Sequence, residues 1–515
     1  MSIMNAQRVA IIGAGVAGLA TARQLIARGI DCTLYERAGR LGGVWAVGYT
    51  GFGAQVQKEL YEFPDYPLPE GTPDFTSGPV IQKYLEDYAH HFGVWESIRF
   101  NTAVIEVREQ PGTADRWRIV SEKAGRRSED RYDLIVVATG LYSGMPNLPS
   151  FPGQEQFRGE VMHVSDFQSP DQLAGRKVVV VGYGKSATDA ALESAAVAEA
   201  TTIVFREPHW PVPPMLLGIL PFKWAMLSRL TSALIPPYYR PTRAERVVHS
   251  LGKPLVWLWW RLVELLLIGQ CRLGSRFGTR VSLIPSKPVE VDTFGEAVML
   301  PKAEFFKAVR TGGIQPQRTE IARFTESGVT LANGETVEAD VVVLGTGWRT
   351  SYAYLPADVQ ARIGFDSDGF YLYRHMVPTE VPGLVFIGST STIECIATYS
   401  LQARWLADLI QGTHQLPAVD AMRRDVAEVK AWKRRWMPYS PARGARLLLH
   451  MLHYHDQLLG DMGIESRRKQ GMFAPFKEVF APYQPSDYRS VAAGNETDVA
   501  GNGARAGRQA KPLAA

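Results

Sequence analysis

Two glycine-rich turns are the residues most able to do chemistry in this sequence. Each lies between a β-type run and a helical pattern: GAGVAG begins at Gly13 and GYGKSA begins at Gly182. In such a turn the first glycine permits the bend, the second lets the backbone approach a pyrophosphate, and the third small residue lets the helix pack closely on the strand. The N–H groups that open the following helix then face the phosphates. Each turn therefore predicts a dinucleotide site, with contacts from Gly13, Gly15, Val16, Ala17 and Gly18 in the first and from Gly182, Gly184, Lys185, Ser186 and Ala187 in the second.

The residue at the end of the next strand distinguishes the two turns. After the first turn this position holds Glu36, whose carboxylate can accept hydrogen bonds from both ribose hydroxyls and would repel a 2′-phosphate. After the second turn it holds Arg206, which can donate two hydrogen bonds to a phosphate dianion. The pair predicts FAD at the first turn and NADPH at the second. Glu207 weakens the second assignment, and a surface arginine without a ligand is the alternative.

Alternating β-type runs and helical patterns must position these turns. Runs of Val and Ile bounded by glycine predict βαβ units on a parallel sheet that is buried on both faces. Residues 176–210 begin a second such unit, residues 339–348 resemble residues 132–141, and residues 383–389 add another buried strand. The predicted fold class is α/β, with two Rossmann-like dinucleotide-binding domains and the NADP domain inserted into the FAD domain. The strand-like runs of the first domain are Val9–Ile12, Thr33–Tyr35, Val104–Val107, Trp117–Val120 and Leu134–Ala138.

The length of the chain also favours more than one domain, because 515 residues are too many for one ordinary core. Residues 1–170 are predicted to form the first part of the FAD domain. Residues 171–335 form the NADP domain, with an apolar and basic insertion at about 213–280, and residues 336–485 complete the FAD domain with C-terminal helices. Residues 486–515 contain almost no large apolar side chains and are predicted to be disordered.

The composition is that of a soluble globular enzyme. Hydrophobic residues make up 46% and charged residues 21% of the chain, and the net charge of +4 is too weakly basic for a nucleic-acid interface. Cys32, Cys271 and Cys395 are too few and too widely spaced for a disulfide framework, a zinc site or a redox pair, and no metal site is predicted. The first residues lack a secretion-signal pattern, so a cytoplasmic location is expected.

A third pattern lies between the two turns. Residues 157–167 read F-x-G-x-x-x-H-x-x-x-F, with His163 at the histidine position. Together with four further segments, this pattern resembles the flavin-containing monooxygenases, the class that also includes Baeyer–Villiger and N-hydroxylating enzymes. The resemblance covers about residues 8–480, and the further segments are ERAGRLGGVW (36–45), KELYEFPDYPLP (58–69), QARW (402–405) and YHDQLLGDMG (454–463).

This resemblance implies a reaction in which NADPH reduces FAD and O₂ adds to the reduced flavin. NADP⁺ stays bound and shields a C4a-hydroperoxyflavin, which transfers one oxygen atom to a small-molecule substrate. The cofactor carries the chemistry, so no catalytic Ser/His/Asp set is required. His163 is then a linker residue that connects domain motion to cofactor binding, and proton transfer is its alternative role. Further cofactor contacts implied by the resemblance are Arg37, Gly43, Val44, Trp45 and Val104.

One position departs from the family pattern. Gln55 stands where an active-site asparagine usually meets the flavin and the nicotinamide. The extra methylene group would move the amide by roughly 1 Å, which matters at a reacting centre. Either the site is rebuilt for another substrate or the oxygen adduct is less well protected, and both alternatives stay open. Gln55 is the candidate catalytic residue.

The oxygen acceptor is predicted from Phe167 and Gln168. Baeyer–Villiger members commonly have tryptophan at the first of these positions and proline or aspartate at the second. The difference favours oxygenation at a nitrogen or sulfur of a lipophilic small molecule, and Baeyer–Villiger oxidation of a ketone or aldehyde is the alternative. A flavin disulfide reductase would need a reactive cysteine pair, whereas an FAD-binding NADPH oxidase without oxygen transfer is compatible with Gln55.

Residues 213–268 look least like part of a nucleotide domain. From residue 213 to Arg261 there are seven basic residues and one acidic residue, Glu245. The segment also contains the apolar run LVWLWWRLVELLLI. That run of 14 residues, with Arg261 and Glu264 inside it, is too short to span a bilayer. It predicts either a helix that lies on an anionic membrane surface or a helix buried in the inserted domain or lining a substrate tunnel. The sequence does not determine the oligomeric state, and a homodimer is one of the possibilities.

Overall fold

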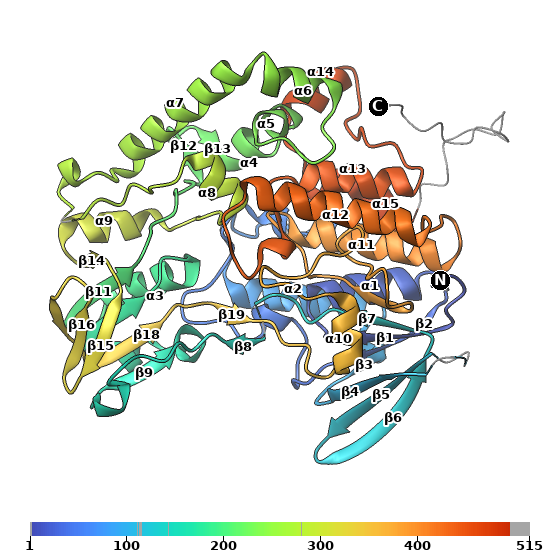
Figure 1. Cartoon of the computed structure of the whole chain (residues 1–515), viewed down its shortest axis with the longest axis horizontal. Helices are drawn as coiled ribbons and strands as arrows, with labels where there is room; N and C mark the ends of the chain where they lie inside the picture. Colours follow the sequence, from blue (N-terminus) through green and yellow to red (C-terminus); the bar gives the residue numbers. More distant parts are fainter. Residues whose placement is uncertain (1–2, 111, 113–115, 143, 280, 495–515) are drawn as a thin grey trace.

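Two parallel β-sheets form the frame of the molecule (Figure 1). The computed structural model describes residues 3–110, 112, 116–142, 144–279 and 281–494. The first sheet has the strand order β20-β7-β1-β2-β3 and the second has the order β14-β11-β10-β18-β9. The strands of the first sheet are β1 (Arg8–Ile12), β2 (Asp31–Tyr35), β3 (Ile98–Arg99), β7 (Leu134–Val137) and β20 (Leu384–Phe386). Those of the second are β9 (Glu160–His163), β10 (Lys177–Val181), β11 (Ala200–Phe205), β14 (Gln315–Arg318) and β18 (Val341–Leu344).

The chain crosses from the first sheet to the second and later returns. It leaves the first sheet after β7, enters the second at β9, leaves it after β18 and re-enters the first at β20. The two crossing segments pair with each other through the short antiparallel strands β8 (Met145–Pro146) and β19 (Trp348–Arg349). The α/β fold, with one nucleotide unit inserted into the other, is therefore confirmed.

The second sheet extends by one strand beyond each predicted boundary of the NADP domain. Strand β9 was assigned to residues 1–170 and β18 to residues 336–485, but both strands belong to the second sheet, where Val342 pairs with Val161. The physical reason is that buried parallel strands are rich in Val and Ile in either sheet. The pattern predicts such a strand without showing which sheet it joins.

A three-stranded antiparallel sheet corrects a second expectation. The runs Val104–Val107 and Trp117–Val120 were predicted as part of the parallel sheet, but they lie in β4 (Ala103–Glu109) and β5 (Trp117–Lys123), which pair with β6 (Arg126–Tyr132). Parallel pairing needs a crossover of about a dozen residues or more. The turn between β5 and β6 consists of Ala124 and Gly125, both with positive φ, which is the geometry of a tight hairpin.

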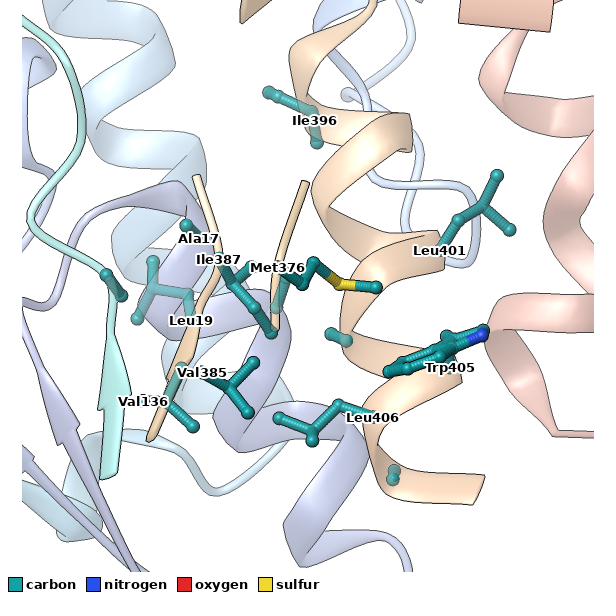
Figure 2. Close-up of a cluster of buried hydrophobic side chains, with 14 of the residues drawn as sticks. Ala17, Leu19, Val136, Met376, Val385, Ile387, Ile396, Leu401, Trp405 and Leu406 are labelled. Atoms are coloured by element: carbon teal, nitrogen blue, oxygen red, sulfur yellow. The ribbon is translucent and has the colours of Figure 1, made fainter. Parts of the chain in front are cut away.

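The main core lies between the first sheet and two long helices that cover it (Figure 2). Helix α1 (Val16–Ile26) contributes Leu19, and α11 (Cys395–Ile410) contributes Leu401 and Trp405, all at most 1% exposed. Val136 of β7 and Val385 of β20 are 0% exposed in the same cluster. The remaining helices of this half are α2 (Gly78–His91), α10 (Ala357–Ile363), α12 (Val419–Trp436) and α13 (Met451–Asp461).

The C-terminal segment is ordered further than predicted. Residues 486–494 were predicted to be disordered, but they include part of the 3₁₀ helix η9 (Pro485–Tyr488) and all of α15 (Arg489–Ala493), with Tyr488 and Val491 fully buried. Gln24 Nε2 donates to the carbonyl of Ala492 at 2.7 Å. A few anchoring side chains and backbone hydrogen bonds thus offset the ordering entropy. Residues 495–515, the rest of the predicted disordered tail, lie outside the described residues.

The inserted unit carries a helical layer away from the first sheet. In Figure 1, α7 (Lys253–Cys271) runs along the upper edge of the molecule. By length and composition α7 is the one helix in the described chain that could cross a membrane, yet only 17% of its apolar stretch is buried. The alternative of a buried core helix is therefore wrong, because few of its side chains meet the protein interior. The other helices here are α3 (Lys185–Ala195), α4 (Phe222–Met226), α5 (Arg229–Leu234), α6 (Arg243–Ser250), α8 (Val289–Gly295) and α9 (Ala303–Thr311).

Candidate active site

The first glycine turn has the shape that its sequence predicts. Gly13 has φ +107°, and a side chain there would meet the carbonyl oxygen of Ala138 at 2.8 Å. Gly15 precedes α1, and a Cβ placed on it would be 3.7 Å from Gly43 Cα. Within the described chain no side chain caps the first N–H groups of α1. The turn therefore presents bare backbone and a helix N-terminus, which fits a pyrophosphate.

The Glu36 carboxylate is held against this turn. It accepts hydrogen bonds from the backbone N–H of Ala14 at 2.9 Å and of Ala38 at 2.8 Å, and Glu36 is 9% exposed. An ionised carboxylate has about four lone-pair sites, so it keeps acceptor capacity for ribose hydroxyls. The geometry fits the predicted ribose contact.

The other residues predicted for the first cofactor gather around the same turn. Gly42 donates its N–H to Ala14 O at 2.9 Å, which brings up the 3₁₀ helix η1 (Gly43–Trp45). Thr102 donates its N–H to Glu36 O at 2.8 Å, and Val104 follows in β4, next to an irregularity in the strand pairing. Arg37, which is exposed, adjoins Glu36 in sequence. The structure thus brings together three segments of the chain, at 13–18, 36–45 and 102–104.

The second glycine turn repeats this geometry with more open space. Gly182 has φ +122°, and its Cβ would meet Gly345 O at 2.5 Å. Gly184 precedes α3, and no described atom lies within 4 Å of the position its Cβ would take. Ala187 is fully buried and packs on Gly345, which brings α3 close to the sheet. Lys185 and Ser186 form the first turn of α3.

A contact that the sequence did not predict joins the two units. The hydroxyl of Tyr49, on the loop after η1, donates to Asp189 Oδ2 at 2.8 Å, and Lys185 pairs with the same carboxylate. Asp189 is 1% exposed, and burial lowers the pKa of Lys185. The spacing of Lys185 and Asp189 along a helix predicts their pairing. No sequence signal predicts Tyr49, because its partner belongs to the other unit.

Arg206 lies at the end of β11 with its side chain in solvent. The side chain is 82% exposed, and its ion pair with Glu320 is long, at 3.9 Å. Glu207, which weakened the sequence assignment, instead pairs with Arg318 at 2.6 Å. Arg206 is therefore exposed directly after β11, and its guanidinium is accessible from solvent.

Gln55 lies at the junction of the two units. Its backbone N–H donates to the Tyr61 hydroxyl at 3.1 Å, and the Tyr61 ring centroid is 5.5 Å from that of Trp45. The next residue, Val56, is 3% exposed and packs in the core of the second unit. Burial raises the pKa of Tyr61, so its phenol stays protonated at neutral pH. Gln55 is thus near η1 of the first unit and the core of the second.

His163 connects the end of β9 to the chain crossing that follows β18. It is 1% exposed at the end of β9, with Nε2 3.1 Å from Gly347 O and Nδ1 2.8 Å from Ser165 Oγ. Burial lowers its pKa, so the ring is neutral at neutral pH. A neutral ring donates from one nitrogen and accepts at the other, and both nitrogens have partners here. These contacts favour the linker role over proton transfer.

Two motifs that carried the family resemblance meet in the interior. Gln402, from QARW, donates through Nε2 to the hydroxyl of Tyr454, from YHDQLLGDMG, at 2.8 Å. Its Oε1 accepts from Gly388 N at 3.4 Å, and the Tyr454 hydroxyl donates to Arg374 O at 2.6 Å. These bonds fix the loop that follows β20 against α11 and α13.

Comparison with known proteins identifies the family. The flavin-binding monooxygenase-like family pattern matches residues 6–240 and 298–505. A probable flavin-containing monooxygenase 1 of Arabidopsis thaliana is 29% identical over 94% of this chain and 97% of its own. The structure of S-allyl-L-cysteine S-oxygenase from Allium sativum superposes with a TM-score of 0.62 and 20% identity over 96% of this chain and 94% of that one. Cyclohexanone monooxygenase from Rhodococcus sp. Phi1, solved bound to NADP⁺, gives a TM-score of 0.63 and 17% identity over 89% and 97%.

The family match covers most of the chain, and it confirms the resemblance inferred from the sequence motifs. The predicted cofactor pair, FAD and NADPH, is the pair used by this family. The chain therefore belongs to the flavin-binding monooxygenase-like family and is a flavoprotein monooxygenase.

Proposed function

We propose that this enzyme transfers one oxygen atom from O₂ to a nitrogen or sulfur atom of a lipophilic small molecule. NADPH, a proton, O₂ and the substrate are consumed, and NADP⁺, water and the oxygenated substrate are formed. The observation that carries the proposal is the position of Phe167. Thr50 donates its N–H to Phe167 O at 2.8 Å, and Phe167 shares a buried cluster with Val56. Phe167 thus contacts Thr50, five residues before Gln55, and lies in the core that Val56 joins.

The first unit is proposed to hold FAD. Gly15 and the N-terminus of α1 would face the pyrophosphate, and the Glu36 carboxylate would accept from the ribose. Gly43 lies beside Gly15, and Gly43 and Trp45 of η1 would border the flavin end. When bound and reduced, the flavin supplies the electrons that activate O₂.

The second unit is proposed to bind NADPH. The open space at Gly184 and the N-terminus of α3 would receive the pyrophosphate, with Lys185 and Ser186 in the first helical turn. The Arg206 guanidinium would donate to the 2′-phosphate and so select NADPH over NADH. The NADP⁺-bound neighbour of the same fold supports this assignment.

The Gln55 amide is proposed to orient the groups at the junction. An amide can donate to one partner while it accepts from another, so Gln55 can contact nicotinamide and flavin together. Trp45 and Tyr61 pack edge to face next to it and would exclude water. A dry pocket matters because water promotes loss of the activated oxygen as hydrogen peroxide.

Two other functions compete with this proposal: oxidation of a ketone and oxidation of NADPH without oxygen transfer. Cyclohexanone monooxygenase has been solved with cyclohexanone and with ε-caprolactone bound, and it shares this fold. Ketone oxidation is therefore the second candidate, although Phe167 stands where such enzymes commonly have tryptophan. The relatives named flavin-containing monooxygenase and the S-oxygenase neighbour favour a heteroatom acceptor. An NADPH oxidase without oxygen transfer would share the cofactor sites.

One experiment separates the three candidates. The purified holoenzyme is incubated with NADPH and ¹⁸O₂ in the presence of a thioether, a tertiary amine and a cyclic ketone of similar size. We expect labelled sulfoxide or N-oxide in amounts that follow NADPH consumption. A labelled lactone would support ketone oxidation instead. Hydrogen peroxide equal to the NADPH consumed, without labelled product from any acceptor, would support an oxidase.

A further inference from the structure

A large apolar surface faces solvent on the inserted unit. On α7 the outward side chains follow helical spacing, and Leu255 is 73%, Trp257 59% and Leu265 64% exposed. Large exposed apolar patches are rare on soluble monomers and often mark interaction sites. We call this surface the apolar face, and its α6–α7 part consists of Val247, Leu251, Leu255, Trp257, Leu258, Trp259, Leu262 and Leu265.

Neighbouring segments extend this surface at both ends of α7. Gln270 Oε1 accepts from Leu217 N at 3.0 Å, and Gln270 Nε2 donates to Met215 O at 2.7 Å, so the hairpin of β12 (Met215–Leu216) and β13 (Leu220–Pro221) adjoins the C-terminal end. Ile219 in this hairpin is 77% exposed. Helix α14 (Ala474–Phe480) packs on α5, which packs on α6. Five apolar residues in α14 and just before it are also exposed, and we include them in the apolar face: Met472, Phe473, Phe476, Val479 and Phe480.

The segment that forms most of the apolar face exposes positive charges only. Between residues 213 and 279 the two acidic residues are both engaged: Glu245 contacts His453 at 2.6 Å, and Glu264 pairs with Arg261 at 2.8 Å. The exposed charged side chains of the same segment are cationic. Five of them lie in α6 or at the two ends of α7, namely Arg243, Arg246, Lys253, Arg272 and Arg276, whereas Arg240 pairs with Asp425 and Glu428 of α12.

The structure fixes α7 lengthwise on the protein. Trp260, on the inward side, donates through Nε1 to Leu234 O at 3.0 Å, and Arg261 pairs with Glu290 of α8. The N-terminal end continues into α6, and the C-terminal end is bonded to the hairpin. A helix held along its whole length cannot turn to cross a bilayer, but it can lie in the plane of one.

We propose that the apolar face docks onto an anionic lipid bilayer. The apolar side chains would enter the boundary between headgroups and acyl chains, and the cations at the ends of α7 would meet anionic headgroups. Tryptophans such as Trp257 and Trp259 are typical of this interface. The family match omits residues 241–297, so the segment that forms most of the face lies outside the matched pattern. The proposal does not depend on which acceptor the enzyme oxygenates.

A second copy of the chain fits this surface less well. A twofold dimer brings the same patch of each copy together. Antiparallel pairing of two α7 helices would place Lys253 and Arg246 of one copy near Arg272 and Arg276 of the other. These like charges would repel across an interface of low dielectric constant. An anionic bilayer satisfies both the apolar and the basic parts.

Vesicle flotation tests the proposal. The holoenzyme is mixed with vesicles of phosphatidylcholine alone or of phosphatidylcholine with phosphatidylglycerol, and its oligomeric state is measured without vesicles. We expect flotation with the mixed vesicles, at least about tenfold less with the neutral ones, and a decrease at high salt. The double variant Leu255→Glu/Leu262→Glu should abolish flotation. Leu148→Glu, at a leucine that is 58% exposed in another part of the chain, should float like the native protein.

A charge variant completes the test. Arg246→Glu/Lys253→Glu should reduce binding to the mixed vesicles about tenfold and leave the weak binding to neutral vesicles unchanged. Circular dichroism must show that each variant is folded. Absence of flotation by the native protein, or equal loss in the Leu148→Glu control, would overturn the proposal. A dimer that Leu255→Glu/Leu262→Glu dissociates would assign the face to a second copy instead.

Discussion

The two dinucleotide units use the same turn but differ in the residue that ends the following strand. Glu36 is 9% exposed and is bonded to two backbone N–H groups of its own unit. The Arg206 side chain is 82% exposed and has a long ion pair. A fixed, buried acceptor suits a cofactor that stays bound, whereas an exposed guanidinium suits one that binds and leaves in each cycle. The difference agrees with the proposed roles, in which the first turn holds a retained flavin and the second an exchanged nicotinamide cofactor.

The first glycine turn also lies in a more covered part of the protein than the second. The first unit is covered by α11 and by the C-terminal segment, where Arg404 donates to Val491 O at 2.9 Å. The second turn has open space next to Gly184. The contact between Tyr49 and Asp189 links the covered unit to the open one. Flavin retention should therefore depend on buried contacts and NADPH affinity on exposed ones.

The largest effect is expected from Glu36→Ala. The substitution removes the proposed ribose contact and leaves the N–H groups of Ala14 and Ala38 without their acceptor. Hydrogen bonds to a charged group contribute about 1.5–3 kcal/mol, so FAD affinity should fall about 10- to 100-fold and the protein should purify largely without flavin. The ratio of flavin to protein absorbance measures this loss.

Glu36→Gln is the matched control, because it keeps one acceptor oxygen and removes the charge. It should retain more flavin than Glu36→Ala. Flavin content at the native level in both variants would contradict the ribose assignment and, with it, the contrast between the two units.

The next largest effect is expected from Arg206→Ala. The Michaelis constant for NADPH should rise about 10- to 100-fold because a charge-assisted contact to the 2′-phosphate is lost, and that for NADH should hardly change. Steady-state oxidation of both cofactors measures the difference. Arg323→Ala, which removes another exposed arginine of the inserted unit, should affect neither. If Arg206→Ala weakens both cofactors equally, Arg206 has a structural role.

Gln55→Ala tests the junction between the units. Hydride transfer needs a stacked nicotinamide, whereas oxygen transfer also needs a dry, ordered pocket. The variant should therefore reduce its flavin at a rate near that of the native enzyme while it releases several-fold more hydrogen peroxide per NADPH. Stopped-flow flavin reduction and a peroxide assay measure the two steps separately.

Gln55→Asn sharpens this test because it restores the family residue. Tighter coupling in this variant would mean that glutamine protects the oxygen adduct less well. Loss of activity on the true substrate would mean that the longer side chain fits that substrate. Native coupling in both Gln55 variants would show that the residue does not contact the flavin.

The fold was largely predictable because its signals are local. Each glycine turn, the strand before it and the helix after it are contiguous in sequence, so the parallel β1 and β10 units could be identified. The assignment of β9 and β18 to a sheet was not predictable, because pairing between distant strands leaves no local signal. The order in residues 486–494 was missed for a related reason, since the partners of Val491 and Ala492 lie on α11 and α1.

The candidate site was predictable in part. The sequence supplied Glu36, Arg206 and Gln55 as individual positions. It did not supply the contact of Tyr49 with Asp189 or the proximity of Tyr61 to Trp45, because these pairs combine segments from different elements. The sequence also could not show which side of α7 is exposed. The helix is apolar nearly all round, and its packing shows that most of its apolar stretch faces solvent.

The smallest effect at neutral pH is expected from a substitution of His455, which lies among the C-terminal helices that pack over the first unit. His455 is fully buried, with Nε2 2.8 Å from Thr398 Oγ1 and Nδ1 3.0 Å from the Tyr488 hydroxyl. Burial, with the positive charge of Arg229 as a second cause, lowers the pKa of His455 to about 3. The unfolded chain binds this proton near pH 6.5, so the folded state holds fewer protons between about pH 6.5 and 3.

Acid should therefore destabilise the packing of the C-terminal helices over the first unit, because His455 must bind a proton there. Its contribution to the free energy of unfolding is fully present above pH 6.5 and should fall by about 1.4 kcal/mol per pH unit below that value. His455→Gln keeps a donor and an acceptor but cannot titrate. The variant should be slightly less stable than the native protein at pH 7.5, and this gap should close or reverse by pH 5. Urea unfolding at several pH values, followed by flavin release, measures the gap. Parallel stability curves for the two proteins would show that His455 is not held neutral, and acid-induced flavin loss would then have to arise elsewhere in the first unit.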